Sequence, residues 1–128
     1  MTTTAVPSES LSESLLWQAV CRFDALRAER GVAALVDREQ VALFRLVDGS
    51  VAAVDHLDPY CRAYVIARGI VGSSGDRITV ASPMHKQVFD LATGECLSEA
   101  GPGLRPWPAR VVDGWVQVAP PPRRTSTS

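Results

Sequence analysis

The sequence predicts an all-β protein, an antiparallel β-sandwich or small barrel of short strands. Short apolar runs recur along the chain, turn-forming residues separate them, and two of the turns are Asp-Gly pairs, at 48–49 and 113–114. An Asp-Gly pair between apolar runs is a strong signal for a tight hairpin. Short strands separated by such turns are typical of sandwiches and barrels, so we expect about eight or nine strands, little helix and no internal repeat.

The expected strands are, in chain order, residues 15–21, 32–36, 40–46, 50–55, 77–81, 87–91, 109–112 and 115–118. The second, third and fourth of these should form a meander. One helical turn is expected at 23–26. Residues 41–44 are apolar in succession, which indicates a strand covered on both faces. The stretches 56–75 and 98–108 are expected to be irregular because turn-forming residues interrupt them.

The chain has 128 residues, which suits a single domain. We expect residues 15–119 to form it. Residues 1–14 are rich in Ser, Thr and Glu and poor in apolar side chains, so they predict a flexible tail. Residues 120–128, which begin with three prolines, predict a disordered tail.

Composition excludes several classes of protein. The net charge is −1 and no basic block is present, so nothing indicates a nucleic-acid partner. The longest apolar runs are too short to span a membrane, and the N-terminus lacks the features of a secretory signal. Three cysteines without close spacing argue against a disulfide framework. We therefore expect a cytoplasmic protein with reduced thiols.

The most specific pattern lies between residues 78 and 94. A strand-like run enters a Ser-Pro-Met-His loop (82–85), and a second strand containing Phe-Asp (89–90) leads to a Thr-Gly turn (93–94). This stretch resembles the loop of Rieske proteins, which hold a two-iron, two-sulfur cluster. In those proteins the loop reads Cys-Pro-x-His. The resemblance implies a second such loop about two dozen residues earlier, so that two loops form the tip where a cluster would sit.

A Rieske cluster needs two thiolates on one iron and two imidazoles on the other. By this resemblance Ser82 takes one Cys position and His85 keeps one His position, whereas Asp58 and Tyr60 take the Cys and His positions of the earlier loop. Serine and aspartate oxygens are hard ligands that replace thiolates poorly. We therefore expect no [2Fe-2S] cluster, no other metal and no catalytic residue in this chain.

Two alternatives involve the remaining cysteines and histidines. A shifted site made of His56, Cys61, His85 and Cys96 would supply two His and two Cys, but its spacing does not match the loop pattern. Cys61 could instead be a reactive thiol beside Arg62, or a small, partly buried filler. A single histidine such as His85 does not make a metal site and more often bonds to backbone.

Three longer segments carry a family resemblance: Asp-Pro-Tyr-Cys-Arg-Ala-Tyr-Val (58–65), Ala-Arg-Gly-Ile-Val-Gly (67–72) and the run 80–91. Together they resemble the small subunit of assimilatory NAD(P)H-dependent nitrite reductase, with similarity from about residue 17 to residue 118. In that family the small subunit has a Rieske-like fold without the cluster ligands. The family usually has another residue, often Tyr, where His85 stands here.

The resemblance implies a cofactor-free subunit of an enzyme that reduces nitrite to ammonium for nitrogen assimilation. FAD, an iron–sulfur cluster and siroheme would belong to the large subunit, its expected partner. Pro59, Tyr60, Pro83 and Met84 would form an apolar tip that binds this partner, or they could merely pack the two loops together. Two other hypotheses stay open: a Rieske-type ferredoxin with atypical cluster ligands, and a thiol redox module that uses Cys61.

Overall fold

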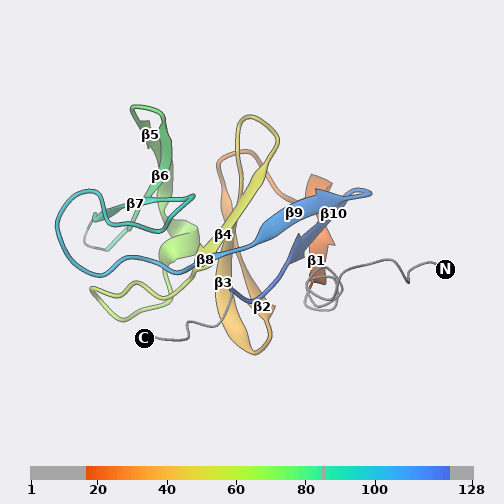
Figure 1. Ribbon diagram of the computed structural model, residues 1–128, viewed down its shortest axis with the longest axis horizontal. Helices are drawn as coiled ribbons and strands as arrows, with labels where there is room; N and C mark the ends of the chain where they lie inside the picture. The colour runs from red at the N-terminus through yellow and green to blue at the C-terminus, as the bar shows by residue number, and fades with distance from the viewer. Residues whose placement is uncertain (1–16, 85, 122–128) are drawn as a thin grey trace, which may run out of the picture.

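The computed structural model describes residues 17–84 and 86–121, and they form three small antiparallel sheets (Figure 1). The elements are β1 (Gln18–Arg22), the 3₁₀ turn η2 (Phe23–Ala25), β2 (Gly31–Val36), β3 (Glu39–Arg45), β4 (Val51–Asp55), the 3₁₀ turn η3 (Ile66–Arg68), β5 (Ile70–Ser74), β6 (Arg77–Ala81), β7 (Val88–Asp90), β8 (Pro106–Trp107), β9 (Ala109–Val112) and β10 (Trp115–Val118). The tail predicted at 1–14, and 122–128 of the tail predicted at 120–128, lie outside the described residues.

Each sheet has a simple strand order. The terminal sheet is β1-β10-β9, the central sheet is β2-β3-β4-β8 and the tip sheet is β5-β6-β7. In Figure 1 the tip sheet and the terminal sheet lie at opposite ends of the long axis, with the central sheet between them. The all-β antiparallel prediction is confirmed, and the sheets stay open and do not close into a barrel.

Strand β3 supplies side chains to two hydrophobic cores. Successive side chains of a strand point to opposite faces. Ala42 and Phe44 enter the core shared with the tip sheet, and Val41 and Leu43 enter the core shared with the terminal sheet. All four side chains are fully buried. This explains the unbroken apolar run at 41–44 and confirms the prediction of a strand covered on both faces.

Several expected elements are confirmed. The meander of β2, β3 and β4 is antiparallel throughout, and the helical turn after β1 is η2. Strands β6, β9 and β10 have the predicted bounds. Asp113 and Gly114 both have positive φ, at 52° and 82°. These are the conformations that an Asp-Gly hairpin turn needs.

Two stretches expected to be irregular contain strands. The first, 56–75, holds η3 and β5. β5 is exposed along most of its length, so it shows no apolar alternation, and backbone pairing with β6 defines it. The second, 98–108, holds β8, a two-residue strand that begins with proline. Trp107 anchors β8 by burial and by donating its Nε1–H to Asp55 Oδ1 over 2.9 Å.

Within the described residues, none of the helical segments is long and apolar enough to cross a bilayer.

Gly94 should be the least replaceable turn residue. Its φ is 81°, and an added Cβ would collide with the carbonyl of Leu104. The Gly94 carbonyl accepts the Leu104 N–H over 2.7 Å, so the backbone segment around Leu104 cannot move away without breaking this hydrogen bond. We expect Gly94→Ala to lower the free energy of unfolding by about 3 kcal/mol, measured by urea denaturation.

Gly49→Ala is the matched control. Gly49 has a φ of 90° with no atom near its would-be Cβ, so this variant should lose only about 1 kcal/mol from the backbone conformation. Equal losses in the two variants would show that the contact with Leu104 is unimportant.

Candidate functional site at the tip

The tip consists of two loops, residues 58–63 and 82–87, with the same backbone hydrogen bonds. In the first loop the Asp58 N–H donates to the Ala63 carbonyl over 2.9 Å, and the Arg62 N–H donates back to the Asp58 carbonyl over 2.8 Å. In the second, the Ser82 N–H donates to the Gln87 carbonyl over 2.9 Å, and the Lys86 N–H donates to the Ser82 carbonyl over 3.0 Å.

The similarity extends to the residue types. Each loop has a proline in its second position, Pro59 and Pro83, and a cation in its fifth, Arg62 and Lys86. Proline fixes φ in the turn conformation and has no N–H that would need a partner. The first side chain of each loop accepts the N–H of the third residue: Tyr60 N donates to Asp58 Oδ1 over 2.8 Å, and Met84 N to Ser82 Oγ over 3.2 Å.

A buried hydrogen bond joins the two loops. The Ser82 hydroxyl donates to Asp58 Oδ2 over 2.5 Å. Asp58 is 0% exposed and Ser82 is 1% exposed, so this contact is out of reach of water. The Cys61 N–H also approaches Asp58 Oδ1, at 3.4 Å. A buried carboxylate needs such partners, because an unpaired one would cost several kcal/mol, about 3–5 in measured cases.

These contacts set the charge of Asp58. Burial by itself would raise the pKa of Asp58. The hydrogen bonds donated by the Ser82 hydroxyl and by the Tyr60 and Cys61 N–H groups favour the carboxylate and lower the pKa below its ordinary value. The group joining the loops is therefore an ionised carboxylate that accepts a hydroxyl.

The donor set at this position does not fit a Rieske cluster. Asp58 and Ser82, at the two positions where the resemblance places thiolates, do come together, but they bond to each other and offer only oxygen atoms. Tyr60 has no imidazole, and His85 lies outside the described residues. The two loops therefore meet as the resemblance implies, with a hydrogen bond at the point where thiolates would hold iron.

Tyr60 turns inward. Its ring packs against Phe89, with the ring centroids 6.1 Å apart. Its hydroxyl is buried without a hydrogen-bond partner of normal geometry among the described residues. Interaction with the Cys96 thiol, followed by burial, raises the pKa of Tyr60 to about 12. The Tyr60 ring is thus partly buried against the hydrophobic core that the tip sheet shares with the central sheet. Its predicted part in a surface contact stays a prediction.

The alternative site built on His56, Cys61, His85 and Cys96 finds little support. His56 is buried, and its Nδ1 accepts the Ala67 N–H over 3.1 Å at the start of η3. Burial and then the charge of Arg68 lower the pKa of His56, so the ring is neutral. Cys96 lies in the tip core. Among residues 17–84 and 86–121, no three His, Cys, Asp or Glu side chains are grouped closely enough to hold a metal ion.

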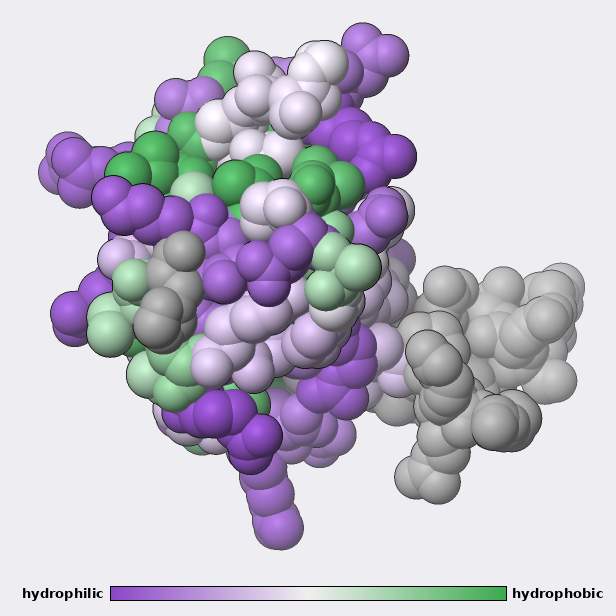
Figure 2. Space-filling model, turned by 90° about the vertical axis from the view of Figure 1, so that its left-hand side faces the viewer, coloured by the Kyte–Doolittle hydropathy of each residue, from purple (hydrophilic) through white to green (hydrophobic). Residues whose placement is uncertain are grey.

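The remaining predicted tip residues reach the surface. Met84 is 55% exposed and Pro83 is exposed, whereas Pro59 is half-buried. Figure 2 views the molecule from the end that carries the tip, and there polar and apolar side chains are interleaved over the surface. A partner at this end would therefore meet a mixed polar and apolar surface that includes the exposed side chains of Met84 and Pro83.

Sequence reasoning did not pair two cations that occupy equivalent positions in the two loops. Arg62 and Lys86 are both exposed and both have a φ of 64°. The signal is present in the sequence as a repeated spacing, Asp-Pro-x-x-Arg at 58–62 and Ser-Pro-x-x-Lys at 82–86.

Known families match this chain over most of its length. The sequence model of the Rieske-like [2Fe-2S] domain matches residues 16–119. The nitrite reductase (NADH) small subunit of Escherichia coli K12 is 37% identical over 103 residues, which cover 80% of this chain and 95% of the relative.

A second relative is much longer. The NAD(P)H nitrite reductase large subunit of Klebsiella oxytoca is 37% identical over 114 residues, which cover 89% of this chain. The matched segment is 12% of that relative, so this chain spans only a small part of its length.

Solved structures of a nitrite reductase small subunit and of a ferredoxin have a fold similar to that of this chain. A Mycobacterium tuberculosis protein assigned as an NADH-dependent nitrite reductase small subunit has a TM-score of 0.80 and 47% identity, covering 84% of this chain and 96% of that one. The ferredoxin of carbazole 1,9a-dioxygenase from Nocardioides aromaticivorans has a TM-score of 0.70 and 27% identity, covering 82% and 98%.

Tyr60 allows a test of the inward placement. We expect Tyr60→Phe to change the free energy of unfolding by less than about 1 kcal/mol, because the hydroxyl has only the weakly accepting Cys96 sulfur beside it. Tyr60→Ala should cost about 3 kcal/mol through loss of the packing on Phe89. Thermal and urea unfolding measure both. A Tyr60→Phe variant as unstable as Tyr60→Ala would show that the hydroxyl, and not the ring, holds the tip.

Proposed function

Because the chain belongs to the family of nitrite reductase small subunits, we propose that it is the small subunit of an NAD(P)H-dependent nitrite reductase. In this proposal it acts by binding the catalytic large subunit through its tip. The complex reduces nitrite to ammonium for nitrogen assimilation in the cytoplasm, and the large subunit carries the FAD, the iron–sulfur cluster and the siroheme.

The single observation that carries the proposal is the pair of relatives. A sequence similar to this chain is almost the whole of a small subunit in E. coli and 12% of a polypeptide named as a large subunit in K. oxytoca. A domain that is a separate chain in one organism and part of the large polypeptide in another is expected to work in contact with that polypeptide. This favours a binding role for the chain.

The tip is the surface best suited to this contact. It presents Met84, Pro83 and part of Pro59 on two loops that backbone hydrogen bonds and the Asp58–Ser82 contact restrain. Methionine and aromatic residues are enriched at the centres of protein interfaces, and a rigid surface loses little conformational entropy on binding. Tyr60 supports the tip from beneath through its contact with Phe89.

We extend the proposal to the absence of a cluster from this chain. The donor chemistry supports this, because the two side chains at the thiolate positions are an aspartate and a serine hydrogen-bonded to each other. The Rieske-type ferredoxin hypothesis requires instead that four side chains bind a cluster at the tip. The likeness to a dioxygenase ferredoxin supports a shared fold, and function depends on the site.

Metal analysis separates these two hypotheses. Chain expressed with iron supplementation and purified without oxygen should be colourless, with iron and acid-labile sulfide far below one cluster per chain. The absorption spectrum and elemental analysis measure this. Stoichiometric iron with sulfide and a red-brown colour would support the ferredoxin hypothesis and contradict a cofactor-free subunit.

Met84→Asp tests the docking surface. A charge placed at the apolar centre of an interface remains poorly hydrated, so affinity for the large subunit should fall about tenfold or more. Isothermal titration or co-purification with the large subunit of the same organism measures it. The control is Val47→Asp, because Val47 is 74% exposed on the β3–β4 turn, at the opposite end of β4 from the tip loop. Equal affinity of both variants and the parent chain would rule out the tip as the interface.

A further inference from the structure

Each tip loop holds a cation in a backbone conformation that glycine would adopt with less strain. Arg62 and Lys86 both have a φ of 64°, in the left-handed region that is uncommon for residues with a side chain. Each closes its loop by donating its N–H to the first residue of that loop, Asp58 or Ser82. The two positions are therefore equivalent in the two loops.

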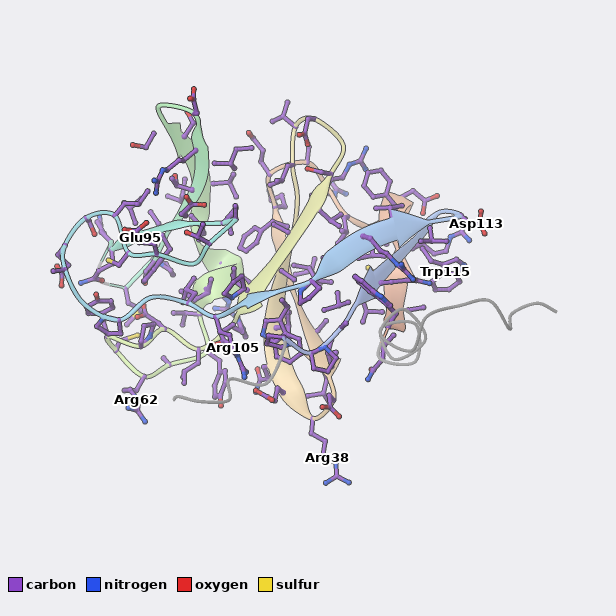
Figure 3. The ribbon with its side chains drawn as sticks, viewed as in Figure 1. Arg38, Arg62, Glu95, Arg105, Asp113 and Trp115 are labelled. Atoms are coloured by element: carbon purple, nitrogen blue, oxygen red, sulfur yellow. The ribbon has the colours of Figure 1, made fainter. Side chains whose placement is uncertain are left out.

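Among the residues that the structure describes, neither cationic side chain is part of an ion pair. The arginines that form ion pairs among residues 17–84 and 86–121 are Arg77, with Asp90 and Glu95, and Arg105, with Glu39 and Asp55. Arg62 and Lys86 are exposed, and in Figure 3 the Arg62 side chain extends away from its loop into solvent. Because glycine adopts this conformation without strain, the turn itself does not require a side chain at either position, and both exposed cations are available to a partner.

We propose that Arg62 and Lys86 form a paired cationic contact for an acidic patch on the nitrite reductase large subunit. The inference rests on the function proposed above and adds the charge of the partner surface. Each cation lies on a loop that begins with one partner of the Asp58–Ser82 hydrogen bond. The loop of Ser82 also carries the exposed side chains of Met84 and Pro83. Protein interfaces commonly combine apolar side chains at the centre with charged ones at the rim. Rim charges mainly accelerate and orient the encounter between partners.

Acidic side chains near the tip should have the opposite effect on the rate of association with an acidic partner. The charge of Asp58 is buried and already accepts hydrogen bonds. Glu99 is exposed on the neighbouring loop, and its charge acts on the Tyr60 hydroxyl. A negative charge at this place would repel an acidic partner. Glu99→Gln should therefore accelerate association, whereas loss of either cation should slow it.

The test uses glycine variants, which should fold at least as well as the parent chain. Arg62→Gly, Lys86→Gly and the double variant each remove charge and relieve the left-handed strain. At low salt the double variant should associate with the purified large subunit roughly threefold to thirtyfold more slowly. The difference should shrink at high salt because ions screen exposed charges. Association rates come from biolayer interferometry, and melting temperatures should be unchanged or raised.

Arg38→Gly is the matched control. Arg38 is an exposed arginine with a φ of 70° in the β2–β3 turn, and Figure 3 shows it on a different loop from Arg62. Its replacement changes the net charge and backbone strain in the same way and should leave association unchanged. Equal slowing by Arg38→Gly, unchanged rates in the double variant, or a fall in its melting temperature would each overturn this inference. Failure of the parent chain to bind the large subunit would instead overturn the proposed function.

Discussion

The packing of the tip sheet on the central sheet fixes the distance between the two tip loops, and the candidate site depends on that distance. Strand β4 leads into the loop of Asp58, and β6 leads into the loop of Ser82. Phe44, Val80 and Phe89 are fully buried in the core that the two sheets share. Protein interiors are packed closely enough that small changes in volume are felt, so the loops cannot drift apart. The hydrogen bond between Asp58 and Ser82 thus depends on the apolar packing of the two sheets that carry the loops.

A hydrogen bond is a much weaker link between the loops than a metal cluster. A hydrogen bond to a charged group contributes about 1.5–3 kcal/mol, whereas a structural metal such as zinc in a small domain contributes about 10–16 kcal/mol. A fold that relies on the weaker link needs loops that hold their own shape. Both loops have such internal support. Each is closed by two backbone hydrogen bonds, and the first side chain of each accepts a third from a backbone N–H of the same loop. Proline in the second position of each loop removes further freedom from the unfolded chain.

The sequence predicts the parts of the fold that follow local rules. The Asp-Gly turns, the meander and the doubly buried strand at 41–44 follow from turn chemistry and apolar periodicity. The resemblance assigns Asp58 and Ser82 to equivalent positions of two loops, and in the structure these two side chains are hydrogen-bonded. Strand β5 escaped prediction because its exposed residues lack alternation, although the Gly-Asp pair at 75–76 is a hairpin signal. The inward turn of Tyr60 depends on space left by Gly101, where a Cβ would meet the tyrosine hydroxyl, and no local pattern shows that. The repeated spacing at 58–62 and 82–86 pairs the two cations in the sequence. It does not give their left-handed φ, which follows from loop closure by hydrogen bonds.

The position of the chain ends explains how one domain can serve both as a separate subunit and as part of a longer polypeptide. Gln18 of β1 pairs with Val118 of β10, so both ends of the described domain leave from the terminal sheet. The tip lies toward the other end of the long axis (Figure 1). In the function proposed above, a covalent connection made at the terminal sheet would leave Met84, Arg62 and Lys86 free to face the partner. Joining the two polypeptides raises the effective concentration of the tip without requiring a new contact, so the same surface can serve in both arrangements.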